Sequence, residues 1–160
     1  MIPLGEPMSI TIDCVRTHAA AMPGRTAMGC AETGRVWTWA QFDSAADRLA
    51  HWLADKLGIA SGARVAVLGR NHPFQLILQY ACERAGAIFV PYNWRLAEAE
   101  ITALMADAEP SLVFHDAEFA VPDSGARKLL LEVARELQLA TLNVKDYTDY
   151  AEHEGLELVR

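Results

Sequence analysis

The sequence is short of basic residues and has no long hydrophobic run. No stretch approaches about 18 consecutive apolar residues, so no segment is predicted to span a bilayer. The opening stretch MIPLGEPMSITID contains no Lys or Arg, and therefore lacks the basic region of a secretory signal peptide. Because 14 Lys and Arg stand against 21 Asp and Glu, with a net charge of −7, neither a nucleic acid nor an anionic membrane surface is an expected partner.

Cysteine is also scarce. Cys14, Cys30 and Cys82 are odd in number and far apart, and no CxxC pair occurs. This pattern excludes a disulfide framework and a zinc knuckle, and we assign no metal-binding residue. We interpret the three thiols as free groups of a core in the reducing cytoplasm.

The sequence does contain enough apolar material for a globular core. Of its 160 residues, 52% are hydrophobic and 22% are charged, close to the average of globular proteins. This length suits one domain that folds without metal or disulfide support. We expect residues 1–8 to be flexible and residues 9–160 to form that domain, with weaker patterning over 120–160.

The first part of the chain predicts a helix, a β-hairpin and a second helix. Pro23 and Gly24 end the first helix, and Gly58 ends the second one in the left-handed conformation. The hairpin turn is expected at residues 32–34. In chain order the expected elements are a helix at 9–22, strands at Thr26–Ala31 and Arg35–Trp39, and an amphipathic helix at Ala40–Leu57.

The next segment alternates strands and helices. Asn71 is placed to cap a helix that begins near Pro73, and Pro91 is placed to close the following strand. Short connections between such elements predict a βαβαβ unit with a parallel sheet and right-handed crossovers. Its expected elements are Arg64–Leu68, Pro73–Ala85, Ala87–Val90, Ala97–Asp107 and Leu112–His115.

The fold class is therefore α/β, with an N-terminal helix and β-hairpin followed by a βαβαβ parallel-sheet unit. A further helix is expected at Gly125–Gln138 and a strand at Ala140–Val144. A weakly patterned acidic tail follows.

The carboxyl ends of the predicted strands are candidate ligand sites, because open parallel sheets usually bind ligands there. No GxGxxG, GxxxxGKS, GxxxxGKT or GxSxG string occurs, so a dinucleotide fold, a P-loop NTPase and a hydrolase nucleophile are not supported. His72 and His115 have no patterned partner, and we interpret them as loop histidines. We assign no catalytic residue. The strand ends in question are 69–72, 91–95 and 115–116.

The turn at 91–96 carries two aromatic side chains, an amide and a guanidinium. Arg95 has the planar, permanently charged group that suits bidentate binding of phosphate. An ion pair with Glu98 or Glu100, at the start of the next helix, is the alternative role of this arginine. Residue chemistry alone leaves both roles open.

Several segments resemble conserved stretches of the AMP-forming acyl-CoA synthetases, in the adenylate-forming ligase superfamily. ERAGAIFVPYNWRLAEAEI (Glu83–Ile101) is similar to the family pattern KAGA, two apolar residues and VP-x-N-x-RL, followed by an acidic helix. The resemblance covers roughly residues 9–120 and is closest to fatty acid–CoA and related acid–CoA ligases. The other matching segments, in the family's order, are PGRTAMGC, VWTWAQFDSAADRLAHWL, GARVAVLGRNHPFQLIL and LVFHDAEF.

The resemblance implies that the chain is part of the large N-terminal domain of an adenylate-forming ligase. Such enzymes use ATP, Mg²⁺ and CoA to convert a carboxylic acid substrate into acyl-CoA, AMP and pyrophosphate. It also implies that Arg95 lies near the nucleotide phosphates of CoA. Asn93 and Tyr92 would shape the turn, and Trp94 would meet the adenine or pack against the protein.

The family's phosphate loop, of the form TSGTTGxPKG, is missing from the sequence. We therefore expect an N-terminal fragment that is inactive alone, binds no cofactor tightly, needs the remainder of the ligase as its partner, and self-associates through exposed apolar surface. The alternative is a free-standing interaction or regulatory module that kept only the ligase scaffold.

Overall fold

The structure is a computed structural model that describes residues 12–132 and Arg135. The chain divides into two compact units, residues 1–43 and residues 44–160. The boundary between them falls inside helix α2 (Trp39–His51).

The first unit contains helix α1 (Cys14–Ala21), a β-hairpin and the start of α2. Asp13 caps α1, because its side chain accepts a hydrogen bond from the Arg16 amide at 2.9 Å. The hairpin pairs β1 (Thr26–Gly29) with β2 (Val36–Thr38) in antiparallel orientation, as predicted. Of the helix predicted over 9–22, residues 9–11 lie outside the described residues.

The helix predicted at Ala40–Leu57 is present, but its last part has a wider backbone spiral. After α2 the chain continues as a π-helical turn, η1 (Trp52–Lys56). The amide of Ile59 then bonds to the carbonyl oxygen of Leu53 at 2.9 Å, and Gly58 adopts a φ of 61°, as expected for a residue that ends a helix.

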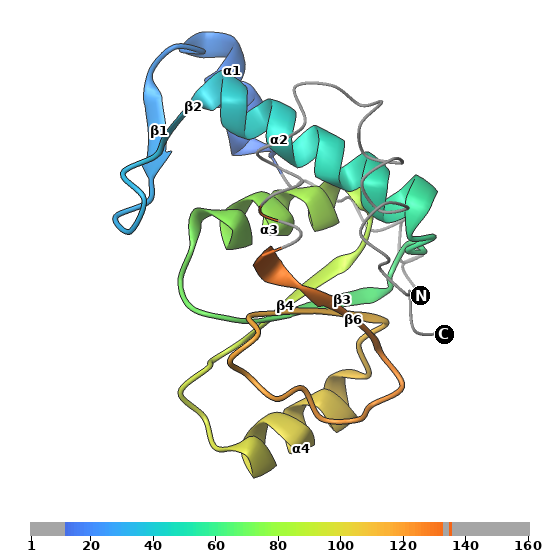
Figure 1. Ribbon diagram of the computed structural model, residues 1–160. Coiled ribbons are helices and arrows are strands. Elements are labelled where there is room, and N and C mark those ends of the chain that lie inside the picture. Colours follow the sequence, from blue (N-terminus) through green and yellow to red (C-terminus); the bar gives the residue numbers. More distant parts are fainter. Residues whose placement is uncertain (1–11, 133–134, 136–160) are drawn as a thin grey trace, which may run out of the picture. The chain divides into compact units, whose positions relative to one another are not determined.

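The second unit is built on a parallel sheet of four strands in the order β4-β3-β5-β6. The predicted βαβαβ unit is confirmed, and Figure 1 shows α3 and α4 on opposite faces of the sheet. The elements are β3 (Arg64–Leu68), α3 (Pro73–Ala85), β4 (Ile88–Tyr92), α4 (Glu98–Ala108), β5 (Leu112–His115) and β6 (Arg127–Leu130).

Each face of this sheet has its own apolar core, because successive strand side chains point to opposite faces. On one face the rings of Phe74, from α3, and Phe114, from β5, meet edge to face with centroids 5.8 Å apart. The other face packs against α4, and its buried cluster consists of Ala66, Leu68, Tyr92, Ile101, Met105 and Val113.

Two local expectations are wrong. His72, rather than Asn71, caps α3, since its Nδ1 accepts a hydrogen bond from the Phe74 amide at 3.0 Å. Pro91 does not close β4 but lies within it, opposite Val67 of β3. Proline is tolerated there because β4 is an outer strand of the described sheet, and its missing N–H removes no bond from a central ladder.

The helix predicted at Gly125–Gln138 is also wrong over its first part, which forms β6. This strand pairs in parallel with β5, with Arg127 opposite Leu112 and Leu130 opposite His115. Its side chains alternate between half-buried and more exposed, and helical backbone begins only at Leu131. The hydrogen-bonding partner supplied by β5 overrides the weak local pattern. The strand predicted at Ala140–Val144 lies outside the described residues, as does the acidic tail.

Candidate functional site

The carboxyl ends of β3, β4 and β5 lie at one edge of the sheet in the second unit. The register places Leu68, the last residue of β3, opposite Tyr92 of β4 and His115 of β5. The segments that follow these three strands therefore come together, although they are far apart in the sequence. This is the edge at which open parallel sheets bind ligands.

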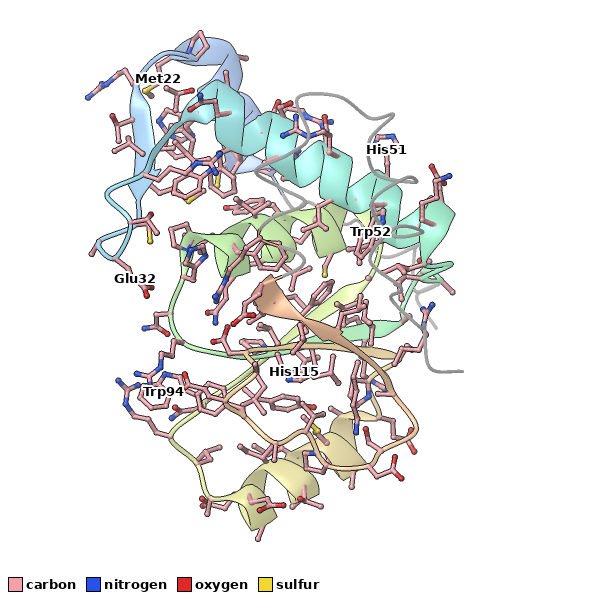
Figure 2. The ribbon with its side chains drawn as sticks, viewed as in Figure 1. Met22, Glu32, His51, Trp52, Trp94 and His115 are labelled. Atoms are coloured by element: carbon pink, nitrogen blue, oxygen red, sulfur yellow. The ribbon has the colours of Figure 1, made fainter. Side chains whose placement is uncertain are left out.

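The indole of Trp94 contacts side chains from the segments that follow all three strands. The guanidinium carbon of Arg95 lies 4.2 Å from the ring centroid, and that of Arg70 lies 4.8 Å from it. Figure 2 shows side-chain nitrogen atoms gathered around Trp94 at the turn that leaves β4. The ring also packs against Phe119, with centroids 5.9 Å apart. The negative face of an aromatic ring attracts cations, so this arrangement holds two positive charges close together.

Arg70 is held by a carboxylate from the third strand end. Its Nε donates to Glu118 Oε1 at 2.6 Å and its Nη2 donates to Glu118 Oε2 at 3.1 Å. This hydrogen-bonded contact, with the positive charge of Arg70, lowers the pKa of Glu118. Both side chains are largely exposed, at 60% and 48%, so the pair contributes little to stability and mainly fixes geometry.

Asp116 fixes the backbone of the same edge. It is buried, its Oδ2 accepts from the Arg70 amide at 2.8 Å, and its Oδ1 pairs with Arg135 Nη2 at 3.0 Å. A side chain at Gly69 would force these neighbours to shift, because a Cβ there would lie 2.8 Å from Asp116 Oδ2 and 2.5 Å from Leu131 Cδ1. The exit of β3 is therefore tightly packed.

Asn93 and Arg95 form the turn after β4. The Asn93 Oδ1 accepts from the Arg95 amide at 3.1 Å, and the Asn93 carbonyl accepts from the Leu96 amide at 3.1 Å. Arg95 is exposed, and within the described ranges it makes no ion pair with Glu98 or Glu100. The carboxylate of Glu100 instead accepts from the Ala97 amide at 2.8 Å, at the start of α4.

Tyr92 lies apart from this charged edge. Its side chain is buried in the cluster against α4, and its hydroxyl has no hydrogen-bond partner among the described residues. Burial raises the pKa of the Tyr92 phenol, and the negative charge of Asp107 adds to that effect.

The two histidines have local contacts. His72 caps α3, and the Nδ1 of His115 lies 3.1 Å from the carbonyl oxygen of Asp116. The structure thus brings together Trp94 and Arg95, which the sequence pattern singled out, with Arg70 and Asp116, which lie in the strand ends named as candidate sites but had no assigned role, and with Glu118, which the pattern did not mark. No local signal marks Glu118, because it is 48 positions from its partner Arg70.

Within the described part of the chain, no three His, Cys, Asp or Glu side chains are grouped closely enough to share a metal ion. No helix among the described residues is both long and apolar enough to cross a membrane.

Comparison with known proteins identifies a family whose members resemble this chain. The profile of the family described as AMP-binding enzyme matches residues 15–157. An indoleacetate–CoA ligase of Aromatoleum aromaticum is 40% identical over 116 residues, which is 72% of this chain and 22% of that protein. The long-chain-fatty-acid–CoA ligase FadD13 of Mycobacterium tuberculosis is 35% identical over 106 residues, 66% of this chain and 21% of that one.

Solved structures of other proteins have a fold similar to that of this chain. The N-terminal domain of FACL13 from Mycobacterium tuberculosis superposes with a TM-score of 0.70 at 28% identity, covering 79% of this chain and 35% of that one. The O-succinylbenzoate coenzyme A synthetase of Bacillus subtilis has a TM-score of 0.67 at 21% identity, covering 74% of this chain and 32% of that one, and shows a shared fold. The chain spans about a fifth of the length of the curated relatives it matches.

Proposed function

This chain belongs to the AMP-binding enzyme family, and from that premise we propose that it is the N-terminal part of an ATP-dependent acid–CoA ligase. Its relatives include ligases named for indoleacetate and for long-chain fatty acids, both joined to CoA. We assign residues 9–160 to the N-terminal subdomain of the AMP-binding domain, in a cytoplasmic enzyme. The remainder of the ligase is the partner that this assignment requires.

The proposed reaction has two steps. A carboxylate oxygen of the acid attacks the α-phosphorus of ATP, and pyrophosphate leaves as the acyl-adenylate forms. The thiol sulfur of CoA then attacks the acyl carbonyl, loses its proton, and displaces AMP to give the thioester. Mg²⁺, when bound, neutralises charge on the phosphates.

The residues of this chain serve the CoA side of that reaction. The observation that supports this most directly is the exposed Arg95 guanidinium, which lies over the Trp94 ring and pairs with no described carboxylate. A cation beside an aromatic face suits a ligand that combines a phosphate with a planar base. We propose that Arg95 binds a nucleotide phosphate of CoA, that Trp94 packs against its adenine, and that Asn93 orients the turn.

The 160-residue chain alone is proposed to be inactive. Stabilising the charge that develops around the α-phosphate during adenylyl transfer requires a phosphate-binding loop and a cation there. The sequence contains no TSGTTG-type string to supply that loop. For the same reason, ATP, Mg²⁺ and CoA are expected to bind this chain weakly.

The test compares the isolated chain with the protein encoded by the uninterrupted reading frame. Each is incubated with ATP, Mg²⁺, CoA and a panel of aryl and fatty acids, and AMP and acyl-CoA are quantified. We expect product only from the longer protein, and Arg95→Ala should raise its KM for CoA more than its KM for ATP. A longer protein without product, or turnover by the isolated chain, would contradict the proposal.

Reading the nucleotides after the Arg160 codon separates this function from the alternative. A ligase requires that the frame continue into a TSGTTG-type loop. A stop codon at that point, together with a specific protein partner, would instead favour the free-standing module.

A further inference from the structure

We infer that Arg70 and Glu118 act together as positioning residues for the CoA phosphate site at Arg95, by clamping the Trp94 ring. The inference rests on the proposed function and extends it to two residues that lie on different loops. The clamp is defined as the Arg70–Glu118 ion pair together with its contact to Trp94.

Arg70 is fixed at both ends. Its amide donates to the buried Asp116, and its guanidinium is held side-on by two oxygens of Glu118, at 2.6 and 3.1 Å. Both carboxylates come from the segment after β5. A planar group bound by two hydrogen bonds has a set orientation, which a single-point contact does not provide.

The clamped guanidinium holds Trp94 from one strand end while Phe119 holds it from another. Arg70 lies 4.8 Å from the ring centroid, and the Phe119 ring lies 5.9 Å away. The guanidinium carbon of Arg95 in turn lies 4.2 Å from the centroid of the indole ring. Because Arg95 is exposed and has no described carboxylate partner, its side-chain position depends on Trp94 and on the Asn93 turn. Preorganising such a group reduces the conformational entropy lost when a phosphate binds.

Because Glu118 is negatively charged, its two possible effects on CoA binding predict changes of opposite sign in the Kd for CoA. If Glu118 acted on an anionic ligand only through its charge, its neutralisation would strengthen CoA binding, because one negative charge near the site would disappear. If it acts as part of the clamp, neutralisation frees Arg70 and Trp94 and weakens CoA binding. The two mechanisms therefore predict opposite changes in the Kd for CoA.

The experiment uses the full-length ligase with Glu118→Gln and Arg70→Lys. Lysine keeps the positive charge but loses the planar two-point contact. Isothermal titration calorimetry gives the Kd for CoA and for ATP, and ATP–pyrophosphate exchange reports the first half-reaction. We expect each variant to raise the Kd for CoA about three- to fivefold, the effect of losing an exposed ion pair, and to leave the Kd for ATP and the exchange rate unchanged.

The control is Asp47→Asn, which neutralises the carboxylate that pairs with Arg84 Nη1 (3.0 Å) elsewhere in the second unit. It should leave the Kd for CoA unchanged. An unchanged or lower Kd for CoA in Glu118→Gln would overturn the clamp, as would an equal rise in the Kd values for CoA and ATP. Failure of the proposed function is distinguishable, because the unmodified ligase would then form no acyl-CoA at all.

Discussion

At the residue scale, the turn after β4 combines an apolar ring with polar surroundings. Trp94 is half-buried, packing against Phe119 and the cluster beneath α4 while Arg70 and Arg95 lie over its ring. An exposed cation–aromatic contact contributes about 0.5–1 kcal/mol, so the value of this arrangement is mainly geometric. The packing of Trp94 determines the position of the Arg95 guanidinium.

A side chain at Gly69 is predicted to destabilise the fold. In Gly69→Ala the new Cβ would lie 2.8 Å from Asp116 Oδ2, an atom already held by the Arg70 amide. We expect a loss of about 1–3 kcal/mol in the free energy of unfolding, the usual cost of overpacking, measured by urea titration. Gly24→Ala is the control, because nothing lies within 4 Å of its added Cβ. Equal stability of the two variants would contradict the expectation.

The thiol of Cys82 is predicted to be unreactive in the folded chain. The residue is fully buried, and burial, with the nearby charge of Glu83, raises its pKa to about 12. Since the thiolate is the nucleophile, this raised pKa leaves very little reactive thiolate at pH 8. Iodoacetamide labelling followed by mass spectrometry should modify the half-buried Cys14 well before Cys82. Both should react once the chain is denatured, and equal native rates would refute this prediction.

At the element scale, the elements with strong local signals lie where the sequence places them. Strand β3, helix α3 and strand β5 match their predicted bounds. The local signals are the glycines on both sides of β3, the proline and glycine that bound α3, and the apolar run of β5 shortly after Pro110. The sequence pattern predicts neither strand β6 nor the inclusion of Pro91 in β4. Both depend on which strand lies beside them, and a propensity pattern does not contain that information.

The cap of α3 provides a test at this scale. His72→Ala removes the Nδ1 atom that accepts from the Phe74 amide, so an N-terminal amide of the helix loses its partner. We expect the free energy of unfolding to fall by about 1 kcal/mol in a urea titration. Asn71→Ala, at an exposed position just before the cap, should leave it nearly unchanged. A larger loss in Asn71→Ala than in His72→Ala would restore the original assignment of the cap to Asn71.

At the scale of the whole molecule, the chain consists of two units, and β4 and β6 are the outer strands of the parallel sheet in the second unit. Among the described residues β4 and β6 each have one neighbour only, and each carries an exposed large apolar side chain, Ile88 and Leu130. Such edges favour pairing between copies. The exposed fractions are 49% and 37% respectively.

We therefore predict that the isolated chain self-associates. Its weight-average mass in sedimentation velocity should increase with concentration, and Ile88→Lys on β4 should reduce that increase, since lysine on an outer strand disfavours edge pairing. Leu76→Lys, at a comparably exposed position on α3, serves as the control and should have a smaller effect. A monomer at every concentration would contradict the prediction.

The residue pattern was enough to predict the family, the α/β class and the βαβαβ order, and it singled out the turn that contains Trp94 and Arg95 as a candidate site. These follow from short segments whose residue types act locally. The tertiary structure alone decided that Glu118 meets Arg70 and that Asp116 secures the exit of β3. The physical reason is that parallel register joins the ends of strands that are far apart in the chain, and no local pattern specifies which side chains meet there.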